Sequence, residues 1–286
     1  MRKILYRYAS TLILLLLAAG LYGQPRSSGP YRLEWKRELG LGSVAIGAAA
    51  TGYLLEQAED PVPYRSLALP AVPSFDRTAL GRNSEAAVAS SDVVAYGTLA
   101  APLLLLTNRQ VATDYLTLGV MFAETLVLNQ GVTDIIKAVV RRPRPYLYAA
   151  SLPPDLEVTA YDRSSYLSNH TSTTAAAAFF AGRVFADYHP DSKLKPYVWA
   201  ASAALPAVAG YLRVRGGQHF PSDVVAGYGL GAAIGYAIPL LHHRGDRTSK
   251  LSVVPTGTGI LLIYRFTGSE ASLGTADLLQ FTETPN

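Results

Sequence analysis

The 286-residue sequence contains no cysteine. This absence excludes disulfide bonds, thiolate metal sites and a cysteine nucleophile, and it also excludes an N-terminal cysteine that could carry a lipid. Cysteine usage therefore gives no information on the cellular compartment. Any argument for export has to rest on the N-terminal sequence alone.

Charged residues are also scarce, at 16% of the chain against 49% for hydrophobic residues. This balance favours membrane association without deciding it. The formal net charge is +4, but residues 1–23 contain Arg2, Lys3 and Arg7 and no acidic residue. The remaining 22 basic and 21 acidic residues nearly cancel. Charge therefore gives no support for a nucleic-acid partner.

The first 23 residues have the pattern of a secretory signal peptide. A basic start is followed by an unbroken apolar run over residues 12–19 and then by small residues, so cleavage is expected after Gly20 or Gly23. The alternative is an uncleaved anchor, although the apolar run is short for a membrane span.

The rest of the chain predicts an all-α fold, a bundle of about six helices with a small C-terminal β-hairpin. We expect a helical domain over residues 24–245, and a hairpin and mobile tail over residues 246–286. The proline-rich stretch 58–92 is expected to be a long exposed loop. The expected helices and the two hairpin strands cover residues 39–55, 93–107, 115–140, 169–186, 197–212 and 223–241, then 251–254 and 260–266.

Two polar stretches begin a candidate phosphate site. Lys137 lies in the closing turns of the helix expected over residues 115–140, and Arg144 follows just past its end, so both cations are expected to project toward one spot. Ser168 and Asn169, followed by His170, open the alanine-rich helix. A serine or asparagine there caps free backbone N–H groups, and such a helix end attracts phosphate.

A third polar stretch, residues 211–223, lies between two apolar runs and is expected to be a loop. Arg213 precedes His219 by six residues, and Asp223 follows it by four. Arginine offers a two-pronged donor for phosphate oxygens, and a carboxylate fixes the tautomer of a neighbouring histidine. Each residue alone has an ordinary structural explanation, such as a helix-surface ion pair or compensation of the helix dipole. The three stretches together favour a phosphate site.

In order and spacing, these stretches resemble the signature of the type 2 phosphatidic acid phosphatase superfamily, which includes bacterial acid phosphatases and vanadium haloperoxidases. That signature reads Lys-x6-Arg-Pro, then Pro-Ser-Gly-His, then Ser-Arg-x5-His-x3-Asp, and the resemblance covers residues 137–223. Leu167 replaces the proline of the second motif and Asn169 its glycine, and Leu212 replaces the serine that opens the third motif. Asparagine tolerates the left-handed region better than most residues, so Asn169 is a mild change.

The resemblance implies a role for each matched residue. His219 would attack phosphorus and form a phosphohistidine, with Asp223 orienting its ring. His170 would be the general acid for the leaving oxygen and then the base for water. The remaining groups would bind the phosphate without a metal or other cofactor: Lys137, Arg144, Ser168, Asn169 and Arg213.

Six further basic residues fall outside these roles. The arginines next to the motifs are expected only to add positive potential, and the remaining histidines are expected to be solvated turn residues. The arginines are Arg141, Arg142 and Arg215, and the histidines are His189, His242 and His243.

The sequence thus predicts an exported phosphatase of phosphate mono- or diphosphate esters, with envelope lipid phosphates as the leading substrate class. The alternatives are a soluble periplasmic acid phosphatase acting on small esters, a vanadate-dependent haloperoxidase, and a non-catalytic envelope protein with a degenerate site. Vanadate is expected as an inhibitor, and would be a cofactor only in the haloperoxidase. Membrane association is expected, and no nucleic-acid partner.

The site is expected to face the periplasm. Three apolar runs precede Lys137, over residues 39–55, 93–107 and 115–136. If all three crossed the membrane after a cleaved signal, the motifs would lie in the cytoplasm, so one run is expected not to cross. The third run carries Glu124 and Asp134, which suit a protein interior better than lipid. A fully soluble periplasmic bundle is the close rival.

Overall fold

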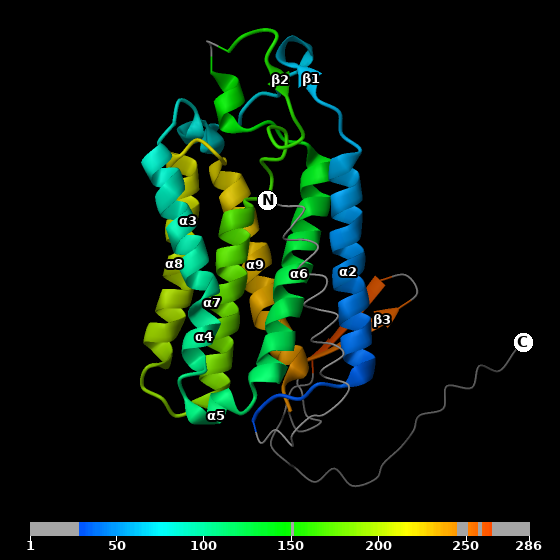
Figure 1. Cartoon of the computed structure of the whole chain (residues 1–286), viewed down its shortest axis with the longest axis vertical. Coiled ribbons are helices and arrows are strands. Elements are labelled where there is room, and N and C mark those ends of the chain that lie inside the picture. Colours follow the sequence, from blue (N-terminus) through cyan, green and yellow to red (C-terminus); the bar gives the residue numbers. More distant parts are fainter. Residues whose placement is uncertain (1–28, 150–151, 245–250, 257–258, 265–286) are drawn as a thin grey trace, which may run out of the picture. The chain divides into compact units, whose positions relative to one another are not determined.

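The computed structural model describes residues 29–149, 152–244, 251–256 and 259–264 (Figure 1). The predicted signal peptide and the tail after the hairpin lie outside the described residues. The predominantly helical class is confirmed. Six of the described helices have 15 residues or more and two are short: α2 Trp35–Gln57, α3 Glu85–Leu99, α4 Ala101–Leu105, α5 Arg109–Ala112, α6 Tyr115–Val140, α7 Asn169–Tyr188, α8 Lys195–Arg215 and α9 Pro221–His242.

The stretch predicted as one long exposed loop, residues 58–92, is more ordered than expected. It contains β1 (Val62–Pro63) and the 3-10 helices η1 (Tyr64–Ser66) and η2 (Ser74–Ala79). Helix α3 begins already at Glu85, because the Ser84 side chain accepts a hydrogen bond from the Ala87 N–H and caps the first turn. The prediction was wrong for residues 85–92, because proline content marks the loop but not where it ends.

The second loop region, between α6 and α7, pairs with the first. It contains η3 (Pro145–Tyr148) and β2 (Glu157–Val158). Strands β1 and β2 are antiparallel, with Val62 opposite Val158 and Pro63 opposite Glu157. This short pairing joins the two loop regions at one end of the helices (Figure 1).

Helix α7 is the central element of the bundle and packs against α6, α8 and α9 (Figure 1). Small residues allow the close approach of α7 and α9. A Cβ atom added at Gly231 would lie 1.9 Å from the Ser172 carbonyl oxygen, and one added at Gly235 would lie 2.2 Å from that of Ala176. Only glycine therefore fits at these two positions of α9.

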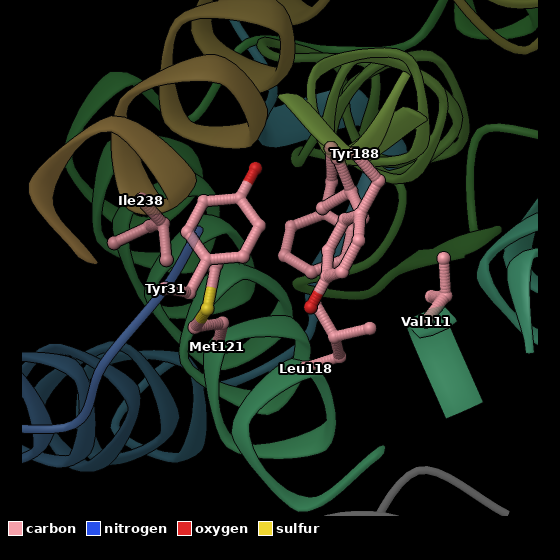
Figure 2. Close-up of a cluster of buried hydrophobic side chains, with 8 residues drawn as sticks. Tyr31, Val111, Leu118, Met121, Tyr188 and Ile238 are labelled. Atoms are coloured by element: carbon pink, nitrogen blue, oxygen red, sulfur yellow. The ribbon is translucent and has the colours of Figure 1, made fainter. Parts of the chain in front are cut away.

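The main apolar core lies among α5, α6, α7 and α9 and includes Tyr31, which precedes α2 (Figure 2). The Tyr31 hydroxyl donates to Asp187 Oδ2 at 2.7 Å, so this buried tyrosine has a partner for its polar tip. Arg32 N–H donates to the His242 carbonyl at 3.0 Å. These contacts place the start of α2 beside the end of α9. The core residues are Tyr31, Val111, Leu118, Met121, Phe180, Val184, Tyr188 and Ile238.

The predicted C-terminal hairpin is present. Strand β3 (Leu251–Thr256) pairs antiparallel with β4 (Gly259–Tyr264), with Leu251 opposite Tyr264 and Thr256 opposite Gly259. The chain divides into two compact units, Met1–His243 and Arg244–Asn286, and the hairpin forms within the second.

Three stretches among the described residues are long and apolar enough to span a membrane, namely Trp35–Gln57, Glu85–Leu105 and Pro221–His242. Apolar side chains on them are exposed, such as Leu39, Val93 and Val225. Trp35–Gln57 contains the run at 39–55, and Glu85–Leu105 overlaps most of the run at 93–107. The run in α6 is not among them, and its polar residues Glu124 and Asn129 are buried against protein. These features support membrane association.

Candidate active site

His219 lies in the connection between α8 and α9 and is buried. Its Nδ1 atom lies 2.7 Å from the Ser165 carbonyl oxygen, which can only accept, so Nδ1 carries the proton. The lone pair of the neutral ring is therefore on Nε2, 3.4 Å from the Arg144 guanidinium. Burial lowers the pKa of His219 to about 3, with Arg144 and Lys137 adding to the effect and Asp223 opposing it. The ring is thus a neutral base at physiological pH.

Asp223 acts on His219 less directly than predicted. Its Oδ2 atom lies 3.8 Å from His219 Nδ1, beyond hydrogen-bond distance. The same oxygen accepts from Ser165 Oγ at 2.5 Å and from the Phe220 N–H at 2.9 Å. Ser165 therefore connects the two residues, since its hydroxyl bonds Asp223 and its carbonyl bonds the imidazole. The motif spacing gave no signal for Ser165.

Arg142 does more than add positive potential, and that part of the sequence interpretation was wrong. Its guanidinium donates to Asp223 Oδ1 at 2.5 Å and to Asp76 Oδ2 at 2.7 Å. It also lies over the Phe220 ring, 4.0 Å from the centroid. Asp76 comes from η2, so no local sequence pattern could pair it with Arg142. Arg142 fixes the carboxylate on which the His219 network depends.

Arg144 is held in a rigid position beside His219. Its Nη1 donates to the Gln218 carbonyl at 2.9 Å and its Nε donates to the Tyr161 carbonyl at 2.9 Å. The guanidinium also stacks on the Tyr161 ring, 4.0 Å from the centroid. Both carbonyls and the ring come from loops, so the tertiary fold and not the helix end aims this side chain.

Lys137 lies in the last turn of α6, as the sequence predicts, and is buried. Its Nζ donates to the Ser164 carbonyl at 2.5 Å. Ser164 precedes Ser165, so the loop that carries the His219 acceptor is also held by Lys137. The charge of Lys137 is near enough to His219 to lower its pKa.

His170 and Arg213 form a second group, joined by a residue that sequence reasoning did not select. Asp92 Oδ1 lies 2.9 Å from His170 Nε2 and 2.7 Å from the Arg213 guanidinium. Burial lowers the pKa of His170 to about 4, with the Arg213 charge adding to the effect and Asp92 opposing it. Arg213 lies in the last turn of α8, and not in a loop as expected. Asp92 had no signal because α3 was predicted to start too late.

Arg213 also has a buried hydrogen-bond donor that is available to a ligand. Its side chain is buried, yet its Nε atom has no hydrogen-bond partner among the described residues. Buried donors are nearly always satisfied, so such an atom calls for a ligand or water. The charge of Arg144 lowers the pKa of His170, His219 and Arg213. The group around His219 and the group around His170 are therefore close enough to interact electrostatically.

Ser168 and Asn169 take structural positions at the start of α7. The Ser168 side chain caps the helix by accepting from the Thr171 N–H, as the sequence predicts. The Ser168 N–H donates to the Asp223 carbonyl at 3.0 Å and so joins α7 to α9. Asn169 is the first residue of α7 and has an ordinary helical conformation, so its tolerance of the left-handed region is not used.

The site thus combines an oriented neutral imidazole, a second histidine held by a carboxylate, and three buried cations. This combination suits in-line attack on an electrophilic tetrahedral centre with negatively charged outer oxygens, because fixed donors meet the charge on those oxygens. Such a site in a helical bundle is of the kind expected in an enzyme that acts on phosphate esters.

The comparison with known protein families agrees with this class. The model of the PAP2 superfamily matches residues 114–247, which include both histidines and all three cations. The chain is accordingly a phosphatase that is similar to the PAP2 superfamily over residues 114–247.

The crystal structure of a transmembrane PAP2 type phosphatidylglycerolphosphate phosphatase from Bacillus subtilis aligns over 84% of this chain and 98% of its own, with 16% sequence identity and a TM-score of 0.36. No curated protein matches the sequence.

Proposed function

We propose that this protein hydrolyses phosphate mono- or diphosphate esters of envelope lipids through a phosphohistidine on His219. The observation that carries the proposal is the buried Arg213 Nε donor without a partner, in the same neighbourhood as two histidines of lowered pKa. A phosphate oxygen satisfies that donor, and a phosphoryl group is the substrate that needs both histidines.

The first step transfers the phosphoryl group to the protein. The Nε2 lone pair of His219 attacks phosphorus, the bond from phosphorus to the leaving oxygen breaks, and protonated His170 gives a proton to that oxygen. Lys137, Arg144 and Arg213 hold the three outer oxygens. In the second step water attacks phosphorus, His170 takes a proton from the water, and the bond from phosphorus to nitrogen breaks.

His170 has to be protonated to act as the acid, although its pKa in the free protein is about 4. The charge of Arg213 is one cause of this low value, and a bound phosphate brings opposite charge beside Arg213. The pKa of His170 therefore rises when substrate binds. Asp92 already acts in the same direction and keeps the ring oriented.

In this mechanism fixed cations, and not a divalent metal in the catalytic site, stabilise the charge on the outer phosphate oxygens. Arg144 and Arg213 are rigid donors of the kind that recognises phosphate. Vanadate adopts the five-coordinate geometry of phosphoryl transfer, and it therefore serves here as an inhibitor.

Lipid phosphates are favoured over small esters by the surface around the site. An open groove of about 750 Å³ runs between α8, α9 and η2, and its walls include Tyr211, Val214, Val224 and Val225. The groove lies along α8 and α9, the helices that carry Arg213 and Asp223. An apolar groove on the helices of a phosphate site suits an acyl or polyprenyl chain.

The test is phosphate release from a panel of lipid phosphates and diphosphates, run beside soluble esters and with His219→Ala as the inactive control. The proposal expects the highest kcat/KM for a lipid substrate. Equal or higher kcat/KM for small esters would favour a soluble acid phosphatase. Halide oxidation with peroxide and vanadate would indicate a haloperoxidase, and no release from any substrate would indicate a degenerate site.

A further inference from the structure

A second cluster of ionisable side chains lies at the other end of the bundle. Glu38 is the fourth residue of α2, Glu124 lies within α6, and His242 is the last residue of α9. All three are buried, so His242 is not the solvated turn residue that the sequence predicted. Asp223 and His242 are 19 residues apart on α9, which places the cluster about 28 Å from the catalytic carboxylate.

The imidazole of His242 is oriented as a metal-binding histidine. Its Nδ1 atom lies 2.8 Å from the Ile238 carbonyl oxygen and so carries the proton. The other nitrogen, Nε2, faces both carboxylates, 2.8 Å from Glu38 Oε2 and 3.3 Å from Glu124 Oε2. A backbone carbonyl on one ring nitrogen commonly fixes the tautomer of a histidine that binds metal through the other.

The carboxylates of Glu38 and Glu124 differ in their hydrogen-bond partners. Glu38 Oε1 accepts from the Glu34 N–H at 2.6 Å and from the Arg37 guanidinium at 2.9 Å, which leaves Oε2 to face the cluster. Glu124 is 3% exposed, and neither of its carboxylate oxygens has a hydrogen-bond partner among the described residues. The charged neighbour of Glu124 is His242, whose Nε2 lies 3.3 Å from Glu124 Oε2 and is shared with Glu38. A divalent ion in place of the shared proton would contact both buried carboxylates directly.

We propose that Glu38, Glu124 and His242 bind a divalent zinc-type cation that joins α2, α6 and α9. One ligand atom from each residue lies within 4.8 Å of the other two. Zinc bonds of about 2.0–2.2 Å in a tetrahedral arrangement separate neighbouring ligand atoms by about 3.3 Å, so the cluster needs only small shifts. One imidazole nitrogen and two carboxylates suit zinc, with water or a further carboxylate oxygen in the fourth position.

The apolar core adjoins the cluster and accounts for its role. Ile238 lies one helical turn before His242, and Met121 lies three residues before Glu124; both are core residues (Figure 2). A cation there would tie together three helix segments that are far apart in the sequence. Its effect is on stability, because the catalytic groups lie at the other end of α9.

The test uses the untagged full-length protein purified in detergent. After dialysis against zinc, elemental analysis should give about one zinc per chain, and Tm should be higher with zinc than with EDTA. Cobalt should give a visible absorption band of a bound ion. Glu124→Gln should weaken zinc binding at least about tenfold. Asp187→Asn, which alters a nearby ion pair with Arg183, should bind zinc as the wild type does.

Wild-type protein that binds no zinc or cobalt overturns the proposal, and the cluster is then an ion-pair network only. Equal zinc affinity of the wild type and Glu124→Gln also overturns it, even if Tm responds to zinc. Below the unfolding temperature, chelation should leave phosphate release unchanged. A failure of the zinc site is therefore distinguishable from a failure of the proposed catalytic function.

Discussion

Asp92 shows how a single carboxylate can adjust the proposed acid of this site. It contacts both His170 and Arg213, and its negative charge raises the pKa of His170 against the stronger effects of burial and of Arg213. In free enzyme His170 has a pKa of about 4, so the protonated form is lost as pH rises above that value. We therefore expect kcat/KM to be highest at acidic pH.

Asp92→Asn should lower the pKa of His170 further, because the charge that opposes the shift is removed. The alkaline limb of the kcat/KM profile should move to lower pH, and kcat/KM near neutral pH should fall about tenfold or more. The measurement is the pH profile of both proteins with one ester of known ionisation. Glu85→Gln, an exposed charge change on the same helix, is the control. If the alkaline limb of the kcat/KM profile is unchanged in Asp92→Asn, Asp92 does not set the pKa of His170.

Substitution of Arg142 tests whether its ion pair holds Asp223 in place. Arg142→Gln leaves the buried carboxylates of Asp223 and Asp76 without their cation, so the free energy of unfolding should fall by about 3 kcal/mol. Turnover should fall with it, since Asp223 loses its fixed position. Thermal unfolding and phosphate release measure the two effects. Arg109→Gln removes an exposed guanidinium on α5 and should change both little. Similar losses in the two variants would contradict the assignment.

The residues proposed to carry out the chemistry were easier to predict than the residues that hold them in place. Lys137, Arg144, His170, Arg213 and His219 stand at fixed spacings in the sequence, and their types indicate phosphate chemistry. Their supports are distant in sequence and follow no pattern: Asp92 is 121 residues from Arg213, Asp76 is 66 from Arg142, and Ser165 is 58 from Asp223. Only tertiary packing brings such pairs together.

At the scale of elements, the pairing of α7 with α9 positions the site. The Ser168 N–H at the start of α7 donates to the Asp223 carbonyl in the first turn of α9. Helix boundaries were predicted well where apolar runs are long, as in α2, α6 and α9. The start of α3 was not, because its cap, Ser84, lies inside a stretch rich in proline and charge.

Gly231→Ala should disturb the pairing of these two helices. Its Cβ would lie 1.9 Å from a backbone oxygen of α7, so we expect a loss of about 1–3 kcal/mol in the free energy of unfolding. Gly229→Ala lies two residues away in α9 with nothing within 4 Å of its Cβ. It should be neutral or stabilising by about 0.5–1 kcal/mol, since alanine favours helix. Thermal unfolding compares the two, and equal stability would contradict the close packing.

For the whole molecule, the direction of α2 bears on which side the site faces. The start of α2 lies beside the end of α9, whereas the catalytic residues lie at the start of α9. If the bundle spans a membrane, the start of α2 and the site are on opposite sides. A periplasmic site then requires residue 32 to be cytoplasmic, which a cleaved signal peptide does not allow. With a cleaved signal, the outward-facing site requires a bundle that does not span.

Single cysteines separate these arrangements, because the natural chain has none. Asp155→Cys places an exposed thiol at the catalytic end and Arg32→Cys places one at the other end. Labelling with an impermeant maleimide at an intact inner membrane should modify Asp155→Cys. If Arg32→Cys is also labelled, the bundle lies wholly outside; if it is protected, the bundle spans. Labelling of Arg32→Cys alone would contradict a periplasmic site.

The most direct test of the proposed chemistry is to trap the covalent intermediate. Wild-type protein is mixed with a substrate carrying radiolabelled phosphate and quenched in alkali, where phosphohistidine is stable and phosphate esters of serine are not. The label should be found in the peptide that contains His219, should disappear on acid treatment, and should be absent from His219→Ala. It should accumulate in His170→Ala if loss of the base slows hydrolysis more than loss of the acid slows transfer. Turnover by His219→Ala at the wild-type rate, or label on a residue other than His219, would contradict the nucleophile assignment.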